Sequence, residues 1–268
     1  MFKTNPFLQR LSAHLLPMKN LTLLSGILVM ALATTIVFGQ ANEGLIVYET
    51  KINLHRNIPK DREDMKAMIP EFSTVRFQLF FNPDESLFKQ LIDEEDDVAT
   101  FNGGGGSGRM MMMRRAMQGE TYLNRNEDLI TLKQEFMGKE YLIEDSVKMS
   151  PWKFGTETKT IAGYTCRMAY YIDESRPDRK QEITAWFTDQ LRPFLGPERF
   201  NTLPGAVLAI DVNNGERVVV AKSVELRTLK KNELKRPATG TKITGKEFRQ
   251  MVEERMKEMR GQGFMIRN

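Results

Sequence analysis

Apolar and polar residues alternate through much of the chain with a period of two, the repeat of a strand with one buried face. The stretch 44–54, GLIVYETKINL, puts Ile46, Tyr48 and Ile52 on one face, with Thr50 between them. The stretch 74–81, TVRFQLFF, alternates in the same way. This pattern predicts two half-buried strands near the start of the folded region.

Short polar turns separate these apolar runs, which predicts hairpins rather than long crossover connections. NPDES turns the chain within a hairpin over 74–92, and NNG at 213–215 turns a second hairpin. Between them, strands are expected near 121–123, 129–136 and 140–143. The chain is therefore predicted to be mainly β, with one large curved antiparallel sheet or an open barrel.

One helix is expected, in the tail that covers residues 231–268. Thr244 is a plausible N-cap with Glu247 three positions later, which is the spacing of a capping box. Phe248 begins the apolar stripe. The helix is expected to end at Gly261 or Gly263.

The chain begins with a stretch typical of exported proteins. An uncharged apolar run, 21–38, follows Lys19 and ends at the small residue Gly39. This pattern predicts a cleaved signal peptide at 18–39, with residues 1–17 an over-called start. An uncleaved membrane anchor is the alternative, although the run is short for a span. The mature protein is expected in the periplasm, at the outer membrane or outside the cell.

The charge balance argues against nucleic-acid binding. Removing Lys3, Arg10 and Lys19 with the leader reduces 39 basic residues to 36, against 35 acidic ones. The mature chain would carry a net charge of about +1, which gives no basic surface for a phosphate backbone.

Cysteine and histidine are scarce, which narrows the chemistry. Cys166 is the single cysteine, so no internal disulfide can form, and it is expected to be a small buried apolar residue. After removal of the leader, His55 is the single histidine. Most zinc sites and histidine-based catalytic triads are therefore excluded. No cofactor is expected on these grounds.

A Gly/Met-rich segment at 93–119 is expected to be a mobile loop within the β-rich region 40–230. It carries five thioethers, from Met110, Met111, Met112, Met113 and Met117. Thioether sulfur is a soft ligand that favours Cu(I), so a copper site is one interpretation. Docking of the methionines onto an apolar partner or a membrane surface is a second, and an incidental loop is a third.

Carboxylates are plentiful, and two of them on separate strands could serve a hydrolase. Nothing in the sequence selects a pair. The acidic run 93–97, DEEDD, lacks the spaced ligands and the central glycine of a calcium loop.

Three motifs carry a resemblance to a known family: IAGYTCRMA at 161–169, ITAWFT at 183–188, and GPERFNTLPGAVLAIDVNNG at 196–215. Their order and spacing resemble the GLPGLI family of secreted Bacteroidetes proteins, over roughly residues 45–229. The run TLPGAV at 202–207 matches three of the six positions of the family motif. The resemblance implies export to the envelope and a β-rich fold, and it carries over no catalytic residue.

The third motif also has a physical interpretation. Pro197 and Pro204 lack the amide hydrogen that a central strand needs. Gly196 and Gly205 are expected to take backbone angles that other residues avoid. These features predict a strand entry at a sheet edge or corner.

The leading hypothesis is a non-enzymatic envelope protein. A curved sheet with a concave face rich in Phe and Val would bind an apolar ligand or another envelope component. The Met-rich copper protein and the carboxylate hydrolase remain the alternatives.

Overall fold

The computed structural model describes residues 42–58, 60–91, 119–175 and 180–265. These residues form twelve strands, two short 3-10 helices and one long α-helix: β1 Gly44–Asn53, η2 Leu54–Asn57, η3 Lys60–Ala67, β2 Phe72–Phe81, β3 Glu85–Gln90, β4 Glu120–Asn124, β5 Leu129–Phe136, β6 Lys139–Ser146, β7 Lys153–Ile161, β8 Tyr164–Asp173, β9 Gln181–Thr188, β10 Ala206–Val212, β11 Arg217–Leu226, β12 Thr241–Thr244 and α3 Gly245–Met265.

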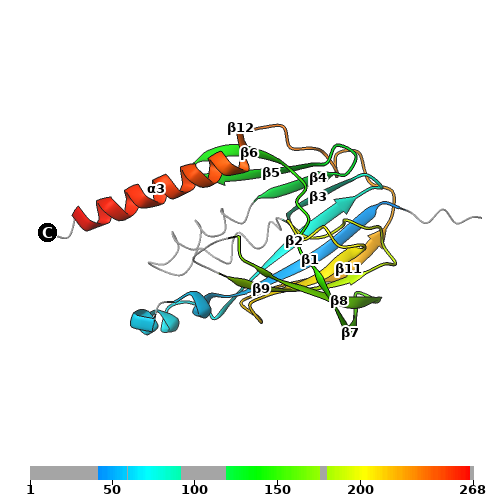
Figure 1. The fold of residues 1–268 in the computed structure, drawn as a ribbon, viewed down its shortest axis with the longest axis horizontal. Coiled ribbons are helices and arrows are strands. Elements are labelled where there is room, and N and C mark those ends of the chain that lie inside the picture. Colours follow the sequence, from blue (N-terminus) through cyan, green and yellow to red (C-terminus); the bar gives the residue numbers. More distant parts are fainter. Residues whose placement is uncertain (1–41, 59, 92–118, 176–179, 266–268) are drawn as a thin grey trace, which may run out of the picture. The chain divides into compact units, whose positions relative to one another are not determined.

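All twelve strands form one open sheet in the order β12-β6-β5-β4-β3-β2-β1-β11-β10-β9-β8-β7 (Figure 1). Neighbouring strands are antiparallel except β12 and β6, which are parallel, so the sheet is mixed. The prediction of a mainly β fold with a large curved sheet and a C-terminal helix is confirmed. The predicted hairpins also form, and Asn213, Asn214 and Gly215 turn the second one with positive φ.

The first strand lies in the middle of the sheet. β1 pairs with β2 on one side and with β11 on the other, where Gly44 faces Leu226. The residues that the alternation assigned to one face do share it: Ile46 and Tyr48 are fully buried, and Phe77 and Leu79 of β2 lie opposite them.

The concave side of the sheet is filled by the segment that joins β9 to β10. Leu195, Phe200 and Leu203 of this segment are completely buried against the inner faces of the strands. β10 lies between β9 and β11. The prediction of a strand entry at a sheet edge is therefore wrong: the motif packs inside the fold and then enters an interior strand.

The reason for glycine in this motif also differs from the prediction. Neither Gly196 nor Gly205 has a positive φ. A Cβ at Gly205 would overlap the backbone carbonyl of Thr188, and one at Gly196 would overlap the carbonyl of Phe200. Close approach of two backbone segments, rather than an unusual backbone angle, requires glycine at both positions.

The capping box of the terminal helix forms as predicted. The Glu247 amide donates to Thr244 Oγ1 at 3.2 Å, and the Thr244 amide donates to the Glu247 carboxylate at 2.9 Å. Phe248 is buried against β5 and β6. The helix runs to Met265 and not to Gly261 or Gly263, because glycine costs an α-helix about 1 kcal/mol but does not forbid it.

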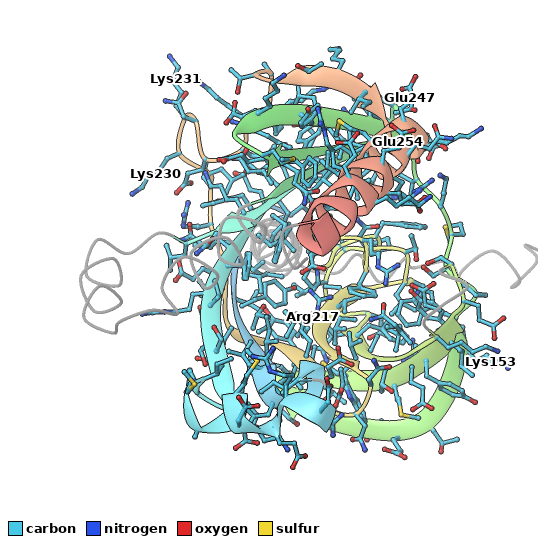
Figure 2. All side chains as sticks on the ribbon, turned by 90° about the vertical axis from the view of Figure 1, so that its left-hand side faces the viewer. Lys153, Arg217, Lys230, Lys231, Glu247 and Glu254 are labelled. Atoms are coloured by element: carbon cyan, nitrogen blue, oxygen red, sulfur yellow. The ribbon has the colours of Figure 1, made fainter. Side chains whose placement is uncertain are left out.

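Residues 227–240, here called the strap, carry the chain from β11 to the far edge of the sheet. Arg236 of the strap pairs with Glu144 of β6 at 2.9 Å and with Glu127 at 3.3 Å. Figure 2 shows Lys230 and Lys231 of the strap pointing away from the sheet. The strap positions β12 beside β6, a pairing that the sequence pattern did not predict.

Two expectations fall on parts of the chain that the structure does not describe. These are the leader at 18–39 with the preceding residues 1–17, and nearly all of the Gly/Met segment at 93–119. In the described part of the chain, no helix is both long and apolar enough to cross a membrane.

Candidate functional site

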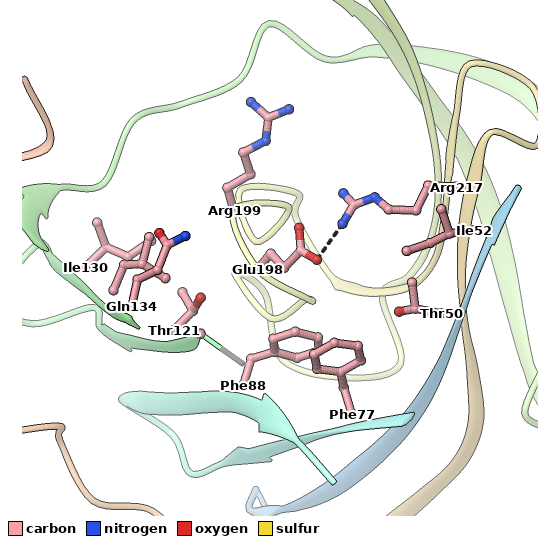
Figure 3. A pocket seen from close by; sticks show the side chains of 12 residues that line it. Thr50, Ile52, Phe77, Phe88, Thr121, Ile130, Gln134, Glu198, Arg199 and Arg217 are labelled. Carbon is pink, nitrogen blue, oxygen red and sulfur yellow. Dashed lines mark hydrogen bonds and ion pairs between the residues drawn. The ribbon is translucent and has the colours of Figure 1, made fainter. Parts of the chain in front are cut away.

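A cavity of about 350 Å³ opens on the concave side of the sheet, and we call it the inner cavity (Figure 3). Its walls come from β1 to β5 on one side, and from β11 and the segment between β9 and β10 on the other. The buried segment that fills the rest of the concave side therefore also forms one wall of this space.

The floor of the inner cavity is aromatic. The rings of Phe77 and Phe88 are stacked, with centroids 4.9 Å apart and an angle of 9° between the planes. Tyr48 meets Phe88 edge-on at 6.0 Å. Ile130 and Leu132 of β5 add aliphatic surface. These contacts make the lower part of the cavity a preformed apolar surface.

Thr50 lies on the wall above this floor. Its side chain is 2% exposed, and its hydroxyl has no hydrogen-bond partner among the described residues. A buried hydroxyl without a partner costs about 1–3 kcal/mol. The Thr50 hydroxyl is therefore an unsatisfied hydrogen-bonding group in an otherwise apolar part of the cavity wall.

An ion pair lies on the side of the cavity opposite β5. Glu198 accepts a 2.6 Å hydrogen bond from Nη1 of Arg217, and both side chains are about 30% exposed (Figure 3). Glu198 has a φ of 51°, a conformation that non-glycine residues rarely adopt. Its backbone carbonyl is held by the Asn201 side chain at 3.0 Å. The turn thus fixes the Glu198 carboxylate toward β11.

A second ion pair supports the same wall. Arg199 contacts Asp173 of β8 at 2.6 Å and also lies over the buried ring of Phe200. Burial raises the pKa of Asp173, but hydrogen bonds from Ser175 and Arg199 outweigh burial and hold the pKa below its usual value. Asp173 therefore stays ionised at neutral pH and anchors the turn to β8.

The candidate copper ligands Met110, Met111, Met112, Met113 and Met117 lie outside the described residues, so the copper site stays a prediction. Among the described residues, no group of three or more His, Cys, Asp or Glu side chains could hold a metal ion. Glu198 is the one carboxylate among the described residues that line the inner cavity, and Arg217 neutralises it. This arrangement gives no support to a two-carboxylate hydrolase at this site.

Sequence reasoning found part of the cavity. The alternation placed Phe77 and Thr50 on the inner face, and both line it. It missed Glu198 and Arg217, which lie 19 positions apart on different elements. The expectation for Cys166 holds: it is buried as a free thiol, and burial raises its pKa to about 11.

No family model matches the chain, and no curated protein matches its sequence. Two solved structures of PNGF-II, in space groups P21 and C2, are similar in fold, with TM-scores of 0.51 and 0.50. Their sequence identities to this chain are 17% and 18%, and each match covers 78% of it. The matched region is 33% and 32% of PNGF-II, so this chain corresponds to about a third of that protein. The likeness is one of fold alone.

Proposed function

We propose that this chain is a binding protein of the cell envelope that holds a small, mainly apolar ligand in the inner cavity. The observation that carries the proposal is the preformed aromatic floor of Phe77 and Phe88 beneath a cavity of about 350 Å³. This volume is at the lower end of the range for small-molecule sites, about 300–1,000 Å³. The proposal is of a carrier or sensor rather than an enzyme.

The polar groups suggest how such a ligand would be oriented. Its apolar body would pack on the stacked rings, and one hydroxyl or carbonyl group would meet the buried Thr50 hydroxyl once that hydroxyl turns toward the cavity. A hydrogen bond made inside an apolar site fixes orientation because the alternative is a buried group without a partner. Glu198 and Arg217 would flank the ligand from the other side.

The test uses N-phenyl-1-naphthylamine, a neutral probe that fluoresces in apolar sites. We expect saturable binding to the wild-type chain. Ile130→Trp fills the cavity and should abolish binding, whereas Ile172→Trp, at a side chain that is 56% exposed, is the matched control. Equal binding by the Ile130→Trp variant and the wild type would overturn the proposal.

The role of Thr50 is tested by displacing the probe with 1-octanol and with octane. The wild type should prefer the alcohol. Thr50→Val keeps the shape of the side chain and removes the hydroxyl, so the preference should fall about fivefold, the effect of about 1 kcal/mol. An unchanged preference would show that the ligand's polar group lies elsewhere.

Export is part of the same proposal and rests on the leader pattern at 18–39 and on the resemblance to the GLPGLI family. N-terminal sequencing of the protein from the envelope fraction should give a mature chain that starts at or near Gln40. Recovery of an intact Met18 terminus in the membrane would favour an anchor instead.

A further inference from the structure

A second hollow lies on the face of the sheet opposite the core. Along β9, Ile183, Ala185 and Phe187 are buried in the core, whereas Thr184 and Trp186 face the other way. The pairing of β7 with β8 shifts between Phe154 and Thr158, and β7 approaches β11, four strands away in the sheet order. Strands β7 to β11 thereby enclose a hollow of about 440 Å³, which we call the outer groove.

The outer groove has an apolar and aromatic floor. The half-buried ring of Trp186 lies beside Ala209, its partner in the neighbouring strand, and Val218 and Val220 of β11 continue this surface. The floor is built from three neighbouring interior strands of the sheet, β9, β10 and β11, so it is rigid and preformed. An aromatic face on such a floor attracts cations through its quadrupole.

The charged side chains of the groove are mostly acidic. Glu157, Glu182 and Asp211 contribute three carboxylates, and Lys159 contributes one ammonium group. Three negative charges against one positive charge leave a formal charge of −2 around the aromatic floor. The groove therefore has the electrostatic character of a site for positively charged groups.

Lys159 shows how a cation fits there. Its Nζ lies 4.0 Å from the centroid of the Trp186 ring. Burial lowers the pKa of Lys159, although Asp211 and Glu157 attract its charge and oppose that change. The chain thus already places one of its own alkylammonium groups on the indole face, at the end of a flexible four-carbon stem that can also extend into solvent.

We propose that the outer groove binds organic cations of the alkylammonium type, such as the lysine side chain of a peptide. The ligand would replace Lys159 on the Trp186 face, with the carboxylates of Glu157 and Asp211 nearby. Lys159 would act as an internal competitor that keeps the affinity moderate. This site is separate from the inner cavity and does not depend on the function proposed for it.

The test uses the tryptophan fluorescence of the protein. The chain has two tryptophans, Trp152 and Trp186, so Trp152→Phe leaves the groove residue as the sole reporter. N-acetyl-lysine methylamide should change this fluorescence saturably, and the uncharged N-acetyl-norleucine methylamide should not. Lys159→Met removes the competitor and should tighten binding of the lysine probe about fivefold, which corresponds to a cation–π contact of about 1 kcal/mol at an exposed lysine.

Two further variants keep the test independent of the reporter. By calorimetry on chains that retain Trp152, Trp186→Leu should abolish binding of the lysine probe, and Glu157→Gln should weaken it severalfold. Circular dichroism checks that each variant is folded. Equal affinity for the charged and uncharged probes would overturn the proposal, as would binding confined to Lys159→Met or binding that survives in Trp186→Leu.

Discussion

The hydroxyl of Tyr48 donates a 2.7 Å hydrogen bond to the backbone carbonyl of Val207, which is 159 positions later in the chain. The pairing of β9 with β10 shifts between Val207 and Ala209, so this carbonyl lies at an irregularity of the ladder. The Val207 amide is also bound outside that ladder, to the carbonyl of Leu195 at 2.8 Å. A buried side chain of β1 thus compensates for the break that admits the β9–β10 segment.

Replacing Tyr48 with Phe should destabilise the fold by about 1–3 kcal/mol, because the buried Val207 carbonyl loses its partner while the packing is preserved. The free energy of unfolding in urea measures this change. Tyr170→Phe is the matched control, since that side chain is 41% exposed and should change stability by less than about 0.5 kcal/mol. Equal losses in the two variants would contradict this role for Tyr48.

Gly205→Val should destabilise the fold by about 1–3 kcal/mol or more, because its Cβ would overlap the Thr188 carbonyl. Gly215→Asn is the informative comparison. Gly215 has a φ of 90° but open space where a Cβ would lie, so asparagine should cost much less there. Comparing the denaturant midpoints of the two variants shows whether lack of space or backbone angle causes the destabilisation at Gly205. A Gly205→Val variant as stable as the wild type would refute the close approach.

Arg192 should contribute strongly to stability although no carboxylate of the described residues pairs with it. Its guanidinium donates to the carbonyls of Glu85, Pro193 and Phe194, at 2.8, 3.2 and 3.4 Å. Burial, followed by the nearby charge of Arg125, lowers its pKa to about 10. Arg192→Met keeps an apolar stem but removes the Arg192 donors from the Pro193 and Phe194 carbonyls and leaves the Glu85 carbonyl with the Asn82 amide alone. Unfolding should therefore become easier by about 2 kcal/mol. Thermal unfolding with no shift would show that these carbonyls find other donors.

The strap should make stability sensitive to acid. Arg227 donates to both carboxylate oxygens of Glu233 at 2.8 Å, and this contact, opposed by burial and aided by the Lys230 amide, lowers the Glu233 pKa from 4.5 to about 2. A lowered pKa stabilises the folded chain above pH 4.5, and the contribution is lost as the pH falls toward 2. In the Glu233→Gln variant, the free energy of unfolding should therefore fall less steeply between pH 4.5 and pH 2 than in the wild type. Urea unfolding across the window measures it, and parallel curves for the two proteins would exclude the linkage.

The strands were predictable from sequence because each carries its own pattern. Val75, Phe77, Leu79 and Phe81 alternate within one strand, and all four are buried. The pairing of β1 with β11 was not predictable, because the residue pattern within a strand does not indicate which distant strand it pairs with. For the same reason, the packing of the β9–β10 segment on the concave side of the sheet could not be predicted.

The candidate sites show the same division. Thr50 and Phe77 were assigned to the inner face by parity, and they line the inner cavity. The Glu198–Arg217 pair depends on a residue with positive φ, and the outer groove depends on an irregularity in β7, so neither follows from periodicity. The importance of Trp186 arises only once β7 brings Lys159 over its ring.

The central position of β1 has a consequence for how the protein is made. One hydrogen-bonding edge of β1 has no partner strand until the chain has been synthesised as far as Leu226. β1 also contains the residues Leu45, Ile46 and Tyr48, which are buried in the folded protein. Throughout this interval the nascent chain exposes an apolar strand edge, which is a template for aggregation. A chain with this topology gains from a holding chaperone during its synthesis, since the sheet can be completed only after β11 has been made.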